Sequence, residues 1–226
     1  MVDHLNPEVP VSKSMKVFFL IAALFFLTAF SACTLFRGTD EPMRSYVLEM
    51  EKGGEARVSD GFRSSNLPSL LVSLPQPAPG YESQRMAYEQ VPHELRFFAT
   101  SQWVDSPASM LAPLITNALE TGTEWGAVIQ LPSVLRGDYR LDLFQVVLVQ
   151  EFTQQSSQIR LALRAQLVTV FDPRVIGTRS FEFHEAAPSE DAYGGVQAAQ
   201  KAVETLLVEL KHWLQGCLHS VQQSDC

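Results

Sequence analysis

The sequence predicts an α+β domain, a mostly antiparallel sheet with two amphipathic helices packed on one face. Residues 157–172 alternate strictly, with Ile159 and Leu161 on one side and Arg160 and Arg164 on the other. This alternation is typical of a strand with one buried and one hydrated face. Two other segments carry apolar residues at helical spacing. The order is strands, helix, strands, helix, without the strand–helix–strand alternation of a parallel sheet.

An apolar segment near the start of the chain has the layout of a secretory signal. Lys13 and Lys16 precede the uncharged residues 17–32, and small residues come just before Cys33. This arrangement resembles the lipobox of bacterial lipoproteins. The resemblance implies cleavage between Ala32 and Cys33, attachment of diacylglycerol to the Cys33 thiol and acylation of the new N-terminus, palmitate being a typical chain.

An uncleaved membrane anchor is the alternative interpretation. Residues 17–36 carry no charge and are long enough to cross a bilayer as a helix. Both interpretations place the remaining chain outside the cytoplasm. Thr34 stands where enterobacterial lipoproteins retained in the inner membrane have Asp, so we expect the periplasmic face of the outer membrane, with the inner membrane as the alternative. Met15 is a more natural start than Met1.

Length and charge indicate one acidic domain on a tether. We predict a signal with an N-terminal extension at residues 1–32, a lipidated tether at 33–43, the domain at 44–216 and a tail at 217–226. The domain is long enough to bury a sizeable core. The net charge of −8 argues against nucleic acid as a partner, because phosphate binding requires clustered basic residues.

Eight strands are predicted from apolar alternation and turn residues. Residues 75–80 hold three prolines, which predict a stiff, extended loop, a polyproline ligand being the less favoured alternative. The apolar phase slips at Phe144 and Gln145, which indicates a β-bulge. The strands are expected at residues 44–51, 67–74, 84–90, 93–100, 125–132, 139–153, 157–172 and 175–184.

The first helix begins at a clear capping signal. Ser106 suits the N-cap and Pro107 the first helical position, while Gly122 predicts the end. Pro113 predicts a kink. Its apolar stripe comprises Met110, Leu111, Leu114, Ile115, Ala118 and Leu119.

The second helix follows acidic residues in 188–191, and Lys211 lies near its predicted end, which suits the helix dipole. Gly216 predicts its termination. Its apolar stripe comprises Val196, Ala199, Val203, Leu206 and Leu210.

Two cysteines remain after Cys33 is assigned to lipidation. Cys217 and Cys226 could pair in an oxidising compartment, or could both be free in a frayed tail. Neither has a histidine at metal-binding spacing, so we expect no metal site.

No catalytic motif is present. The sequence lacks a nucleophile elbow, a P-loop, a dinucleotide fingerprint and a zinc-protease motif. His184 and Glu185 read best as an exposed strand end. Asp138 and Asp142 share a strand face with Arg140 between them, which favours a solvated face over a carboxylate pair. We therefore predict no enzyme activity, no catalytic residues and no cofactor.

Short motifs throughout the domain resemble those of the ABC-type transport auxiliary lipoproteins, the group of the paraquat-inducible intermembrane-transport lipoprotein. Each is weak alone, but their order and spacing together are fairly specific. They lie at residues 46–48, 81–88, 99–103, 107–111, 139–142 and 194–202.

The resemblance implies a periplasmic lipoprotein that works beside a substrate-binding protein of the mammalian-cell-entry (MCE) type, and indirectly with an ABC permease and ATPase. Such systems move lipids or other hydrophobic compounds between membranes. Two other functions stay open: a lipid carrier with its own cavity, and an envelope scaffold or regulator that binds cell-wall machinery. Association into a homo-oligomer also stays open.

Overall fold

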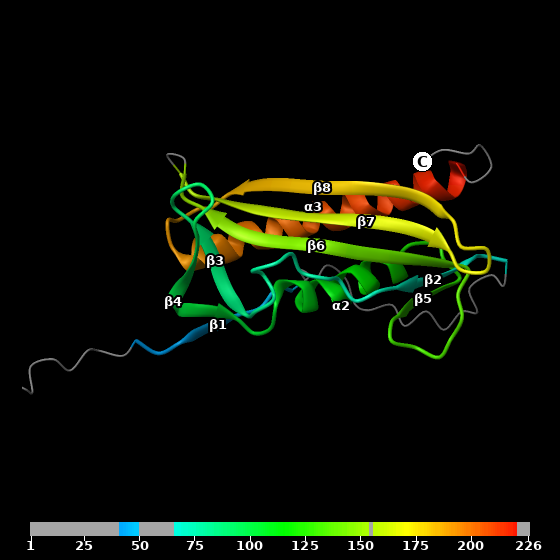
Figure 1. Ribbon diagram of the computed structural model, residues 1–226, viewed down its shortest axis with the longest axis horizontal. Coiled ribbons are helices and arrows are strands. Elements are labelled where there is room, and N and C mark those ends of the chain that lie inside the picture. Colours follow the sequence, from blue (N-terminus) through cyan, green and yellow to red (C-terminus); the bar gives the residue numbers. More distant parts are fainter. Residues whose placement is uncertain (1–40, 50–65, 154–155, 221–226) are drawn as a thin grey trace, which may run out of the picture. The chain divides into compact units, whose positions relative to one another are not determined.

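A computed structural model describes residues 41–49, 66–153 and 156–220 and contains all eight predicted strands and both predicted helices (Figure 1). Together they form an α+β fold with an eight-stranded sheet. The elements are β1 (Arg44–Tyr46), β2 (Ser69–Val72), β3 (Arg85–Glu89), β4 (Leu95–Trp103), α2 (Pro107–Glu120), β5 (Ala127–Gln130), β6 (Tyr139–Glu151), β7 (Gln158–Thr169), β8 (Val175–Ala186) and α3 (Ala192–Ser220).

The sheet is mixed, so the expectation of a mostly antiparallel sheet is wrong. β6 pairs antiparallel with β7, which pairs antiparallel with β8. The other edge of β6 pairs parallel with β2 near its start and with β3 near its end. β5 lies parallel to β2, and β1 lies parallel to β4. α2 lies between β4 and β5 and forms part of the long connection that brings β5 and β6 parallel to β2, as parallel strands require.

The proline-rich segment lines the edge of β6 between β2 and β3. The backbone N–H of Gln76 donates to Leu143 O and that of Ala78 donates to Val146 O, each at 2.9 Å. The prolines occupy the alternate positions, where the missing N–H would point away from β6. The segment is extended, as predicted, and it joins β2 and β3 into one interrupted strand along β6.

The predicted bulge in β6 is confirmed. The register with β7 shifts between Phe144 and Val147, and Gln145 adopts a left-handed backbone with φ 58°. The extra residue reverses the alternation of the strand, so apolar side chains before and after it share one buried face. They are Leu141, Leu143, Val146 and Leu148.

α2 begins and ends as its sequence predicts. The Ser106 hydroxyl accepts from the Ser109 N–H at 3.2 Å, and Pro107 occupies the first helical position. The helix ends at Glu120, two residues before Gly122.

α3 is longer than its sequence predicts. The Asp191 carboxylate accepts from the Gly194 N–H at 2.8 Å and caps the start. The helix does not end at Gly216 but continues to Ser220. Trp213, Leu214 and Cys217 around that glycine are buried. Their burial at about 1.5–3 kcal/mol for a large apolar side chain outweighs the cost of about 1 kcal/mol for a glycine in a helix.

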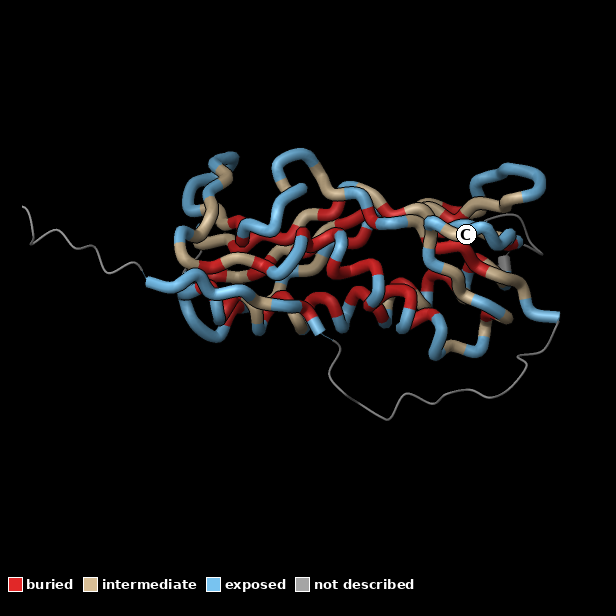
Figure 2. Tube along the Cα trace, turned by 90° about the horizontal axis from the view of Figure 1, so that it is seen from below, coloured by how far each residue is buried: buried red, intermediate tan, exposed pale blue. Residues whose placement is uncertain are grey.

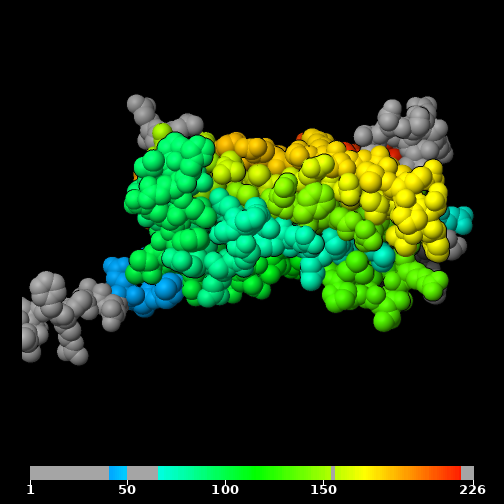
Figure 3. Space-filling view, in the orientation of Figure 1, coloured from blue at the N-terminus to red at the C-terminus, as the bar shows by residue number. Residues whose placement is uncertain are grey.

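Both helices pack on the same face of the sheet. α3 contacts β7 and β8, while α2 contacts β5, β6 and α3. Buried residues follow the layer between helices and sheet (Figure 2). The opposite face of β6, β7 and β8, here called the helix-free face, is turned toward the viewer in Figure 3. It carries Phe144, Val147, Arg160, Arg164, Glu182 and His184.

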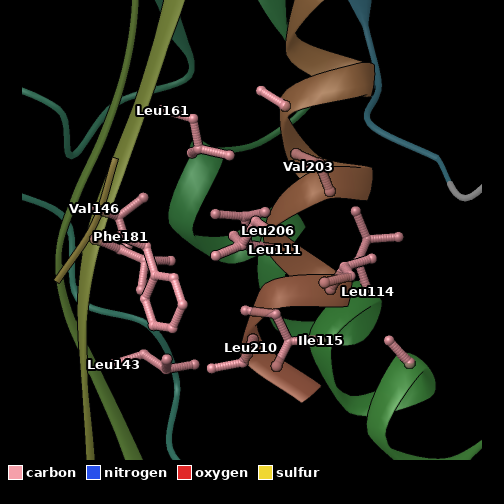
Figure 4. Close-up of a cluster of buried hydrophobic side chains, with 14 of the residues drawn as sticks. Leu111, Leu114, Ile115, Leu143, Val146, Leu161, Phe181, Val203, Leu206 and Leu210 are labelled. Atoms are coloured by element: carbon pink, nitrogen blue, oxygen red, sulfur yellow. The ribbon is translucent and has the colours of Figure 1, made fainter. Parts of the chain in front are cut away.

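Side chains from three directions fill the layer between helices and sheet (Figure 4). Leu206 and Leu210 of α3 lie beside Leu111 and Ile115 of α2, and all four are almost completely buried. The sheet faces them with Leu143, Val146, Leu161 and Phe181. Such close packing of apolar side chains stabilises the folded domain.

Candidate functional site

The predicted processing site lies outside the described residues. Ala32, Cys33 and the apolar segment before them belong to this part of the chain, so cleavage and lipidation stay predictions. Among the residues that the structure describes, none forms a helix that is long and apolar enough to span a membrane.

Cys217 is fully buried in α3 and forms a disulfide. Its partner lies outside the described residues, as does Cys226, so pairing between these two cysteines stays a prediction.

The two carboxylates near the start of β6 accept hydrogen bonds from different donors. Asp142 accepts from Arg140 Nε and Nη2, each at 2.9 Å. Asp138 Oδ2 accepts from the backbone N–H and the hydroxyl of Ser69, each at 2.7 Å. The backbone bond first, and then the hydroxyl, lower the pKa of the Asp138 carboxyl. The two acids therefore have structural partners and do not form a pair.

His184 and Glu185 point to opposite faces of β8. Glu185 stands opposite Ile159 on the side of the helices, while His184 stands opposite Arg160 on the helix-free face. The sequence neighbours do not act together.

A polar network occupies one end of the helix-free face. Arg160 Nε donates to Glu151 Oε1 at 2.6 Å, and its Nη2 lies 3.9 Å from Glu89 Oε1. Gln158 Nε2 donates to Glu151 Oε2 at 3.0 Å. Burial, and after it the Glu89 charge, raise the pKa of the nearby Tyr81 hydroxyl, while the Arg160 charge acts in the opposite direction. The end of β3 and the paired ends of β6 and β7 bring these groups together.

His184 extends this network along β8. Its Nε2 lies 3.1 Å from Glu182 Oε1, and its Nδ1 lies 3.2 Å from Gln158 Nε2 and 3.8 Å from Glu151 Oε2. Carboxylates outnumber the guanidinium, so this corner is negative when the histidine is neutral. We define the polar network as Tyr81, Glu89, Glu151, Gln158, Arg160, Glu182 and His184.

The polar network is suited to recognition. Its charges hold one another in place, and an arrangement fixed before binding loses little entropy when a partner docks. No group of three or more metal-ligating side chains occurs among the described residues. Sequence reasoning missed the network because its members lie on separate strands. The only local signal was the row of polar side chains on the wet faces of β7 and β8.

The first strand is fastened to the last helix at several points. Tyr46 packs on Tyr193 with ring centroids 6.2 Å apart, and Leu48 is buried. The Glu49 N–H donates to Gln200 Oε1 at 3.1 Å, and Gln200 Nε2 donates to the Glu49 carbonyl. The chain that enters the domain from residue 43 is thereby joined to α3.

Comparisons with known proteins bear on the family and the fold of this chain. The family model described as "ABC-type transport auxiliary lipoprotein component" matches residues 46–210. The fold is similar to a crystal structure of a Xanthomonas campestris protein of the DUF330 family, with TM-score 0.66, 22% identity, and coverage of 79% of this chain and 98% of that one. An uncharacterized protein is similar with TM-score 0.57 and 10% identity, over 77% of this chain and 99% of that one.

No curated protein matches the sequence. The match to the family model runs from Tyr46 in β1 to Leu210 in α3 and so includes all of α2, much of α3 and every strand in between. The chain therefore belongs to the family of ABC-type transport auxiliary lipoprotein components.

Proposed function

We propose that this protein is anchored by acylated Cys33 at the periplasmic face of the outer membrane and serves an MCE-type ABC system that moves lipids or hydrophobic compounds between membranes. In this proposal it acts by binding the MCE-type periplasmic protein and turns over no substrate. The observation that carries the proposal is the family match across residues 46–210. The lipobox resemblance at Cys33 supports the anchor.

The helix-free face is the best supported surface for the partner. α3 packs on the other face of β7 and β8. On the helix-free face Arg164 is exposed, with its guanidinium 5.8 Å from the Phe144 ring centroid. Among the described residues Arg164 has no ion pair. An unpaired arginine beside an aromatic ring and a fixed polar network offers both charge and apolar area to a protein partner.

The packed core favours coupling over lipid carriage. A carrier of this fold would hold an acyl chain between the helices and the sheet. There, Leu111, Ile115, Leu206 and Leu143 already contact one another and are almost completely buried (Figure 4). A lipid in this layer would have to displace them.

The decisive experiment compares charge reversals on two faces. Tagged full-length wild type, Arg164→Glu and Lys201→Glu are purified from crosslinked membranes, and the recovered proteins are quantified by mass spectrometry. Lys201 is an exposed cation on α3, away from the sheet, and serves as the matched control. We expect wild type and Lys201→Glu to recover an MCE-type protein and Arg164→Glu to recover roughly tenfold less, about 1.4 kcal/mol.

Three results would contradict parts of the proposal. Recovery of cell-wall enzymes alone by wild type would favour the scaffold function. Stoichiometric lipid on the purified protein would favour the carrier. Equal recovery by all three proteins would place the partner elsewhere on the surface. Membrane fractionation of Cys33→Ala tests the anchor, because this variant should no longer be processed and held at the outer membrane.

A further inference from the structure

Large apolar side chains stand exposed at one end of the domain. Val134 is 99% exposed, Leu135 60%, Phe171 74% and Val175 58%. Val134 and Leu135 belong to the loop between β5 and β6. Phe171 lies in the turn between β7 and β8, and Val175 is the first residue of β8. We name these four residues the apolar tip. Apolar side chains gathered at protruding loops are typical of an interaction site.

The two loops of the tip are held side by side. The Val170 N–H donates to the Asp138 carbonyl at 2.9 Å, which joins the hairpin to the end of the loop. Asp138 is in turn bonded to Ser69 at the start of β2. Within the hairpin, the Arg174 N–H donates to Thr169 Oγ1 at 3.0 Å. The exposed side chains are therefore presented by a braced structure.

Two arginines flank the tip. Arg136 follows Leu135 and is exposed, and no ion pair holds it among the described residues. Arg174 precedes Val175 and pairs with Asp172 at 3.0 Å, although both side chains are largely exposed. Guanidinium groups beside exposed apolar side chains match the boundary of a bilayer, where phosphates lie next to acyl chains.

The tip and β1 lie at opposite ends of the domain (Figures 1 and 3). β6 runs between these ends and has 13 residues. At about 3.3 Å per residue, it spans about 40 Å. The chain from Cys33 to residue 43 reaches at most about 35 Å when fully extended. Because β1 directly follows the tether, the tether enters the domain at the end remote from the tip, and it is shorter than β6.

We propose that the apolar tip inserts into the same bilayer that holds the lipid anchor, so that the domain lies along the membrane with both ends attached. This inference rests on the proposed acylation of Cys33. Val134 projects free of the surrounding surface, which suits a fluid medium that needs no complementary shape. A few apolar side chains bind a bilayer only weakly, but the anchor makes their insertion an intramolecular step with a high effective concentration.

The experiment places a fluorescent reporter at the tip. Phe171→Trp in the full-length lipidated protein is reconstituted into phosphatidylethanolamine–phosphatidylglycerol vesicles that contain brominated lipid, which quenches nearby tryptophan. The native Trp103, Trp125 and Trp213 are buried and give a shielded background. Val208→Trp is the matched control, because Val208 is 53% exposed on α3. We expect at least twofold quenching for Trp at position 171 and none for position 208.

A second variant and a second arrangement sharpen the test. Adding Val134→Ser and Leu135→Ser to the Phe171→Trp protein should reduce the quenching at least by half. Brominated lipid confined to separately added vesicles should quench neither reporter. Quenching only from the added vesicles would overturn the proposal in favour of an apposed bilayer. No quenching in either arrangement, with the protein floating with its vesicles, would overturn it while leaving the anchor intact. Failure to float would instead contradict the acylation of Cys33.

Discussion

The side-chain amide of Gln200 bonds both backbone groups of Glu49, 151 positions earlier in the chain. An amide can do this because it carries a donor and an acceptor side by side, as a neighbouring strand would. Tyr46 packing on Tyr193 and the burial of Leu48 reinforce the contact. The segment that continues into the tether is thus secured to α3, the helix that packs against β7 and β8.

Gln200→Ala should release the N-terminal strand from α3. Two hydrogen bonds of about 0.5–1.5 kcal/mol each are lost, so we expect the free energy of unfolding to fall by about 1–2 kcal/mol. Hydrogen exchange should accelerate selectively at residues 44–49. Chemical denaturation and exchange measurements on the purified protein check both effects. Lys201→Ala, at the next and exposed position, should change stability by less than about 0.5 kcal/mol. Equal effects of the two substitutions would show that the Gln200 contact contributes nothing.

Three glycines of α3 offer a second test within one helix. A Cβ on Gly194 would overlap the Ser189 carbonyl oxygen, whereas a Cβ on Gly216 meets no described atom within 4 Å. A Cβ on Gly195 would overlap Gln150, which is almost fully buried. Gly194→Ala and Gly195→Ala should each destabilise the protein by about 1–3 kcal/mol. Gly216→Ala should stabilise it by about 0.5–1 kcal/mol, because alanine is the better helix former.

Thermal unfolding of the three variants gives the comparison directly. A higher melting temperature for Gly194→Ala than for Gly216→Ala would refute the close packing at the start of α3.

The local elements could be predicted because their signals are local. Ser106 and Pro107 mark the start of α2 by themselves, and the phase slip at Gln145 marks the bulge. Sheet order could not be predicted, because nothing in residues 67–90 says that they lie parallel to a strand that starts at residue 139. Gly216 misled the prediction of the end of α3, since tertiary burial of Trp213 outweighs a local helix breaker.

The candidate surfaces were harder to predict than the strands. Arg160 was placed correctly on the wet face of β7, but its partners Glu151 and Glu89 come from other strands. Their meeting depends on the register of β6 against both β7 and β3. The apolar tip likewise unites two loops that are distant in sequence. Charge and hydropathy along the chain show each such residue singly. The fold is needed to show that these residues lie together.

The Asp138 carboxyl should make stability depend on pH. Its folded pKa is lowered by the Ser69 bonds, so its stabilising contribution is present above the unfolded pKa of about 3.9 and is lost as pH falls through the lower folded pKa. Asp138→Asn removes this titration. The difference in unfolding free energy between wild type and Asp138→Asn should be constant from pH 7 to about pH 5 and shrink below about pH 4. A constant difference down to pH 2 would contradict the assignment. Denaturant titrations at each pH provide the measurement.

The ion pair of Arg160 and Glu151 supports the polar network, and a double-mutant cycle can isolate it. Both side chains are largely shielded, 23% and 13% exposed. Arg160→Met removes the guanidinium of the polar network and leaves Glu151 and Glu89 without that cation, so we expect a loss of about 2–3 kcal/mol in unfolding free energy. Glu151→Gln keeps the shape of its side chain and relieves the unpaired charge. The double variant should therefore be more stable than the sum of the single effects implies, with a coupling of about 1–2 kcal/mol.

The same cycle at the more exposed Arg140 and Asp142 should couple by less than about 1 kcal/mol, because exposed pairs are screened by water. Equal coupling at both pairs would mean that burial does not strengthen the Arg160–Glu151 ion pair. That result would contradict a fixed arrangement of charges on the helix-free face.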